Sequence, residues 1–97
     1  MSLNVFNELM QKDFYICGIT KRLTKKAIDN LFTIETKDFI RSSPDVVLVD
    51  ASLRPYENQY LFTYKLAGGK NGVCHKTVTY ISKYQIDAYF KEVKTHR

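Results

Sequence analysis

Two stretches of alternating residues flank a glycine-rich segment, and this pattern constrains the fold more than any other feature. Residues Gln59 to Ala67 and Val73 to Ser82 are rich in Tyr, Phe, Val and Thr. Strands with one buried face favour these residue types, and their buried and exposed side chains alternate with a period of two. The segment from Gly68 to Gly72 lies between them and has the composition of a loop. The sequence therefore predicts an antiparallel β-hairpin.

The apolar residues also predict the register of this hairpin. If all five residues from Gly68 to Gly72 form the loop, Leu66 lies opposite Cys74 and Phe62 lies opposite Val78. Register follows the face that must be buried, so we favour this loop length. It collects one aromatic row: Tyr60, Phe62, Tyr64 and Tyr80. The same register leaves a mainly polar, solvent-exposed opposite face: Leu61, Thr63, Lys65, His75 and Thr77.

The aromatic row has two interpretations. We expect it to be core beneath the last helix, since the apolar positions of that helix need a sheet to cover. The alternative is a platform on which single-stranded bases stack.

Helical patterns occupy much of the remaining chain. Apolar residues with helical spacing follow Ser2, Thr24, Thr36 and Ser82, and each of these can cap the N-terminus of a helix. The last helix is expected to point four residues inward: Ile86, Tyr89, Phe90 and Val93.

The strand patterns complete the expected fold. Phe14 to Ile19 is a short β-rich run, Val46 to Val49 is apolar on both faces as in a central strand, and Arg54 to Asn58 is turn-like. We predict an α+β fold in which three to four helices cover an antiparallel sheet of three to four strands with a C-terminal hairpin. A chain of 97 residues makes a single globular domain, residues 1–97.

The order of a helix, a strand, two helices and a hairpin resembles that of a winged-helix domain over roughly residues 3–81. The resemblance implies a recognition helix from Thr36 to Ser42 and a wing tip at Lys70. That helix offers only Lys37 and Arg41 as basic donors, and a third strand joins the wing. We therefore expect the simpler packing of helices on a sheet, with the winged-helix order as the second possibility.

Positive charge is segregated along the chain, whose net charge is +5. No acidic residue lies between Glu57 and Asp87, and none lies from Phe14 to Ile28. Segregated charge attracts anionic partners. The principal anion-binding residues are expected before and within the first turn of a helix: Lys21, Arg22, Lys25 and Lys26. A secondary patch is expected on the hairpin: Lys65, Lys70 and Lys76.

Reactive groups are few. The cysteines, Cys17 and Cys74, lie in β-like runs without metal-ligand spacing, so we expect buried free thiols. The histidines, His75 and His96, lack a predictable partner for acid-base or nucleophilic chemistry. We predict no catalytic residue, no metal site and no cofactor.

These observations predict a small basic nucleic-acid-binding accessory or regulatory protein that is not an enzyme. The partner would be the phosphate backbone of a nucleic acid. The alternative is a protein-binding module, an inhibitor or adaptor, whose basic surface docks on an acidic protein surface or on the nucleic-acid-binding face of a larger protein. No run of the sequence suits a signal peptide or a membrane span, so we expect a cytoplasmic protein without a membrane partner.

Overall fold

Two antiparallel sheets of three strands each organise the chain in the computed structural model, which describes residues 4–43, 45–68 and 72–93. The large sheet has the strand order β3-β4-β5, and the small sheet has the order β1-β2-β6. Four α-helices accompany them, so the predicted α+β class is confirmed. The elements are α1 (Asn4–Gln11), β1 (Phe14–Ile16), β2 (Ile19–Leu23), α2 (Lys25–Leu31), α3 (Ile34–Ser42), β3 (Val47–Tyr56), β4 (Gln59–Gly68), β5 (Val73–Ser82), the 3-10 turn η1 (Lys83–Gln85), α4 (Ile86–Tyr89) and β6 (Phe90–Glu92).

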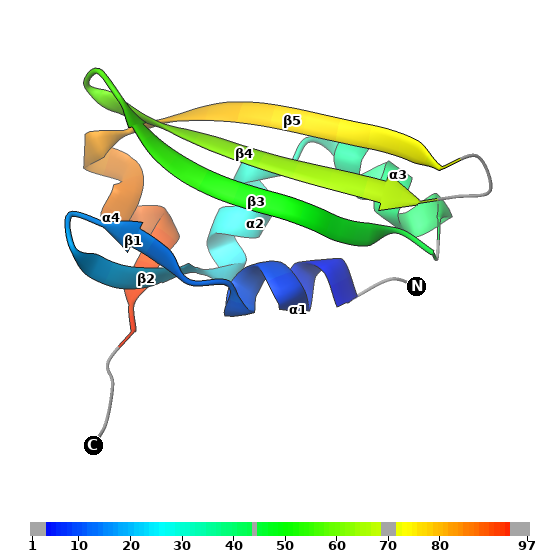
Figure 1. Ribbon diagram of the computed structural model, residues 1–97, viewed down its shortest axis with the longest axis horizontal. Coiled ribbons are helices and arrows are strands. Elements are labelled where there is room, and N and C mark those ends of the chain that lie inside the picture. The colour runs from blue at the N-terminus through cyan, green and yellow to red at the C-terminus, as the bar shows by residue number, and fades with distance from the viewer. Residues whose placement is uncertain (1–3, 44, 69–71, 94–97) are drawn as a thin grey trace.

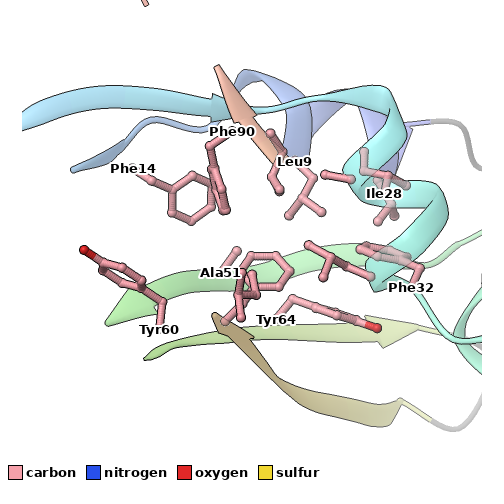
Figure 2. Close-up of a cluster of buried hydrophobic side chains, with 14 of the residues drawn as sticks. Leu9, Phe14, Ile28, Phe32, Ala51, Tyr60, Tyr64 and Phe90 are labelled. Atoms are coloured by element: carbon pink, nitrogen blue, oxygen red, sulfur yellow. The ribbon is translucent and has the colours of Figure 1, made fainter. Parts of the chain in front are cut away.

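The core lies on one face of the large sheet, which we call the inner face. Helices α1 and α2 and the hairpin β1–β2 lie on that side (Figure 1). The central strand β4 contributes one buried residue at every second position: Tyr60, Phe62, Tyr64 and Leu66. Figure 2 shows Leu9, Phe14, Ile28 and Phe90 pointing toward this row from the opposite layer. The alternate side chains of β4 therefore form one side of the core, because successive side chains of a strand point to opposite faces.

Aromatic contacts join the layers. Phe14 of β1 lies edge-on to Phe62, with ring centroids 6.0 Å apart, and to Phe90 of β6 at 5.6 Å. Phe32, directly after α2, stacks on Tyr64 at 4.5 Å with an interplanar angle of 9°. Offset stacks and edge-on pairs are the preferred geometries of aromatic rings. These contacts fix the small sheet and α2 to the middle of β4.

Side-chain caps begin three of the helical segments. The Thr24 hydroxyl accepts a hydrogen bond from the Ala27 amide, and Ser82 caps η1 in the same way, as the sequence predicts. The third cap corrects an expectation. Helix α3 is capped by Thr33, whose hydroxyl accepts from the Thr36 amide, so Thr36 lies inside the helix and not at its start.

The segment around Gly18 also differs from expectation. The run from Phe14 to Ile19 is not one strand but a tight hairpin whose two-residue turn is Cys17-Gly18. Both turn residues have positive φ, 53° and 79°, which the type I′ turn of such hairpins requires. The return strand β2 contains Lys21 and Arg22, so these two cations lie in a strand rather than in a turn before a helix.

The register of the second hairpin corrects the prediction by one residue. Leu66 lies opposite His75 and Phe62 opposite Thr79, and the last pair is Gly68 with Val73. The loop therefore has four residues. On the inner face β5 presents His75, Thr77, Thr79 and Ile81. On the outer face it presents Cys74, Lys76, Val78 and Tyr80. A one-residue shift moves every side chain of a strand to the other face, so Tyr80 is outside and 58% exposed.

Three further expectations are wrong. Strand β3 is an edge strand, with Val47 and Val49 about half exposed, and it runs through Arg54 to Tyr56 before a two-residue turn. The chain after Ser82 forms only a turn and a short helix, and Phe90 belongs to β6, which pairs with β2. One expected sheet is thus two sheets, and the winged-helix order is not confirmed.

Truncating the β4 side of the core should destabilise the protein strongly. We expect Phe62→Ala to lower the free energy of unfolding by about 3–5 kcal/mol, because this fully buried ring contacts rings from both sheets. Urea unfolding followed by circular dichroism measures the change. Tyr15→Ala is the matched control, since that ring is 75% exposed and its removal should cost less than about 0.5 kcal/mol. Equal losses of stability in the two variants would contradict this assignment of the core.

Candidate functional site

The outer face of the large sheet gathers exposed rings, valines and cations. Rows of directly opposite residues across β3, β4 and β5 define it: Tyr56-Gln59-Ser82, Arg54-Leu61-Tyr80, Ser52-Thr63-Val78, Asp50-Lys65-Lys76 and Val47-Ala67-Cys74. Several of its large apolar side chains are about half exposed: Val47, Tyr56, Val78 and Tyr80. No element within the described ranges covers this face. Exposed apolar patches of this kind mark interaction sites.

An aromatic pair dominates one end of the outer face. The rings of Tyr56 and Tyr80 lie 6.2 Å apart with an interplanar angle of 59°, and they are 51% and 58% exposed. They come from the two edge strands, where Tyr56 lies opposite Gln59 and Tyr80 lies opposite Leu61 of the central strand. Each ring is held on a paired strand and not on a loop. The arrangement presents two exposed aromatic surfaces in fixed positions.

Cations flank the aromatic pair along the sheet. Arg54 lies beside Leu61 in the same row as Tyr80, and two rows further Lys65 lies directly opposite Lys76. All three are exposed, with Asp50 as the one acidic member of these rows. Like charges directly opposite one another across a strand pair are destabilising. Asp50 lies directly opposite Lys65 on β3, so this row carries two cations and one carboxylate, and an anion bound beside Lys76 would offset the remaining positive charge.

The structure separates the other predicted anion-binding residues from this face. The Lys21 ammonium lies 2.6 Å from the Asp87 carboxylate, and the Lys21 side chain is only 14% exposed. The Arg22 guanidinium lies 2.7 Å from Asp13. Lys21 is therefore paired with an acidic residue remote in sequence, and Arg22 with one across the β1–β2 hairpin. The absence of acidic residues from Phe14 to Ile28 had suggested that both cations were unpaired.

The remaining predicted cations have different surroundings. Lys25 and Lys26 are exposed in the first turn of α2, which lies on the inner side of the large sheet. Lys70 lies outside the described residues. Of the six predicted residues that the structure describes, Lys65 and Lys76 alone are brought together on the outer face.

A polar network occupies the inner face where β5 meets α3. Thr36 is the buried polar residue at its centre, and its hydroxyl accepts a hydrogen bond from Tyr64 OH at 3.1 Å. The same hydroxyl lies 2.9 Å from Nε2 of His75 and 2.9 Å from the Thr33 hydroxyl. Thr77 adds a contact of 3.1 Å to His75 Nε2. Hydrogen bonding makes inward polar side chains tolerable on this edge strand.

Removing the central hydroxyl should cost stability. We expect Thr36→Val to lower the free energy of unfolding by about 1–3 kcal/mol, because the buried Tyr64 hydroxyl is left without its acceptor. Thermal or urea unfolding provides the measurement. Thr63→Val on the outer face is the isosteric control and should change stability by less than about 0.5 kcal/mol. Adding Tyr64→Phe to Thr36→Val should not cost a further full increment, and simple additivity would contradict the network.

Both thiols are free and exposed, which corrects the expectation that they are buried. Cys17 lies in the first hairpin turn, and Cys74 lies at one end of the outer face. A hydrogen bond between Cys17 Sγ and Tyr60 OH, 3.6 Å long, raises the pKa of Tyr60 above its usual value, and burial of the phenol acts in the same direction.

Exposure predicts fast chemical modification of the two cysteines. A thiol-specific reagent should label both in the native protein at rates comparable to those in denaturant, since neither side chain must be uncovered first. Mass spectrometry counts the labels, and Cys17→Ser and Cys74→Ser assign them. Slow native labelling of either residue would contradict its placement.

The sequence analysis did not assign Arg54 and Tyr56 to a binding face, and it placed Tyr80 on the same face as Tyr60, Phe62 and Tyr64. For Arg54 and Tyr56 the sequence contains a pattern that could have placed them in a strand. Ala51, Leu53 and Pro55 alternate with Ser52, Arg54 and Tyr56, which extends the strand pattern to the turn. Tyr80 was missed because maximal apolarity of one face favours the other register.

Neither a search for metal-binding clusters nor comparison with known proteins assigns a function to this chain. Among residues 4–43, 45–68 and 72–93, no three His, Cys, Asp or Glu side chains gather to hold a metal ion. No helix in these same ranges has the length and apolarity needed to cross a membrane. In comparisons with known proteins, the chain matches no family model, no curated protein and no solved structure.

Proposed function

We propose that this protein binds single-stranded nucleic acid on the outer face of the large sheet. The observation that carries the proposal is the exposed Tyr56–Tyr80 pair, at a centroid distance of 6.2 Å, on the same open face as Arg54, Lys65 and Lys76. Aromatic rings on a sheet stack on unpaired bases, and neighbouring cations contact the phosphates. The net charge of +5 favours encounter with a polyanion.

A single strand suits this surface better than a duplex does. Stacking needs bases that are not already stacked on one another, and the two tyrosines offer nothing to the closed edge of a base pair. The outer face is also a sheet of three ten-residue strands, without a helix that enters a groove. Sequence preference is therefore expected to be weak.

The proposed role is binding without catalysis. His75 is the histidine among the described residues, and its Nε2 is engaged by Thr36 and Thr77 on the inner face. It lies on the side of the sheet opposite the proposed ligand.

The tyrosine pair provides the direct test. Tyr56→Ala with Tyr80→Ala should weaken binding of a labelled, mixed-sequence single strand by at least about fivefold for each ring, since stacking on one base is worth about 1–3 kcal/mol. Fluorescence anisotropy at two salt concentrations, with DNA, RNA and duplex probes, measures affinity and strand preference. Tyr15→Ala, on the small sheet and 75% exposed, is the matched control.

Substitution of the cations tests whether nucleic acid binds at the outer face or at the segment from Lys21 to Lys26, which the sequence analysis favoured. Lys65→Gln with Lys76→Gln should flatten the slope of log affinity against log salt by about 0.7 for each phosphate that the variant no longer neutralises. Lys25→Gln with Lys26→Gln removes the same charge from the other side of the sheet and should leave the slope unchanged. If only the second pair alters binding, nucleic acid binds at α2 and the outer-face proposal is wrong.

A protein-binding role is the second candidate, and the exposed valines favour it. Val47 and Val78 extend the outer face with apolar surface that phosphates and bases do not need. An acidic protein with an apolar centre to its interface would cover both regions. Wild-type protein that binds no oligonucleotide at low salt, but captures a host protein that Tyr80→Ala does not, would select this role.

A further inference from the structure

A second surface, on the other side of the large sheet, has the features of a small-molecule site. A cavity of about 390 Å³ lies where α1, α2 and α3 meet. Its apolar wall consists of Phe6 and Met10, one turn apart on α1, and Ile28 of α2. Phe6 and Met10 pack against the core and are only half-buried. The volume falls within the range of ordinary ligand pockets, about 300–1,000 Å³.

Three cations surround this apolar wall. Lys25 comes from α2, and Lys37 and Arg41 come from α3. Asp29 is the one acidic side chain that lines the cavity. The lining therefore carries an excess of positive charge directly beside apolar surface. Such a combination suits a ligand that has both an apolar body and a negative charge.

The positions of the cations on α3 strengthen this inference. Lys37 and Arg41 are four residues apart and share one helix face, where like charges repel. The Lys37 ammonium donates to the Asp29 backbone carbonyl at 3.0 Å, which fixes the ammonium at the boundary between α2 and α3. Arg41 has only a long contact of 3.6 Å to the exposed carboxylate of Asp38. The Arg41 guanidinium therefore retains donors for a bound anion.

We propose that this cavity binds a small amphipathic anion, an aliphatic or aromatic body that carries one carboxylate or sulfonate group. The body lies against Phe6, Met10 and Ile28, and the charged group lies among Lys25, Lys37 and Arg41. This site is separate from the outer face, since it is built from the helices on the inner side of the large sheet. Its test does not depend on nucleic-acid binding.

Anilinonaphthalene sulfonate is a suitable probe, because it is an aromatic anion whose fluorescence rises in apolar surroundings. We expect saturable binding to the native wild-type protein. Lys25→Gln with Arg41→Gln should weaken it by about tenfold or more, which corresponds to about 1.4 kcal/mol. Lys26→Gln with Lys91→Gln removes two exposed cations outside the lining and should change the affinity by less than about twofold. Laurate should displace the probe, and uncharged dodecanol should displace it much less.

A second variant tests the apolar half of the site. Asn7 is exposed and lines the cavity, so Asn7→Trp should fill it without disturbing a buried position and should abolish probe binding. Circular dichroism verifies that each variant is folded. Three outcomes would each overturn the proposal. The wild type binds the probe without saturation, the Lys25–Arg41 and Lys26–Lys91 double variants weaken binding equally, or Tyr56→Ala with Tyr80→Ala abolishes probe binding.

Discussion

The inner row of β4 is the constraint on which the rest of the structure depends. Its rings contact both Phe14 of the small sheet and Phe32 at the end of α2. Phe62 receives the edges of Phe14 and Phe90, and Tyr64 receives the face of Phe32. Cores are close-packed, so the positions of these rings set the positions of the elements that carry them. Strands β1 and β6 are three residues long and gain their stability from this contact.

The polar inner side of β5 follows from its place at the edge of the sheet. Near α3 the inner face of β5 is polar, and the network around Thr36 satisfies His75, Thr77 and the Tyr64 hydroxyl there, whereas Ile81 at the other end of the strand is fully buried. Because polar residues fill the inner side, the apolar and charged residues of β5 lie outside. The hydrogen-bonded edge therefore creates the exposed face to which we assign binding.

Charge along the sequence and charge on the surface are different quantities in this protein. Folding brings Asp87 to Lys21 and Asp13 to Arg22, although no acidic residue lies from Phe14 to Ile28. Among the described cations outside these two pairs, one group lies on the outer face of the large sheet, Arg54, Lys65 and Lys76, and another lies around the cavity between the helices, Lys25, Lys37 and Arg41. One group accompanies exposed rings, and the other accompanies an apolar wall. These different neighbours are the reason for assigning them different ligands.

The sequence by itself determined the α+β class, the caps at Thr24 and Ser82, and the burial of alternate residues along β4. These features depend on local composition and periodicity, which act between residues close in the chain. Only the tertiary structure decided the register of β5, the edge position of β3, the pairing of β6 with β2 and the partners of Lys21 and Arg22. Each depends on contacts between residues remote in sequence. In β5 the observed register is not the one that makes one face most apolar; it places His75 on the inner face, where its Nε2 lies 2.9 Å from the Thr36 hydroxyl on α3.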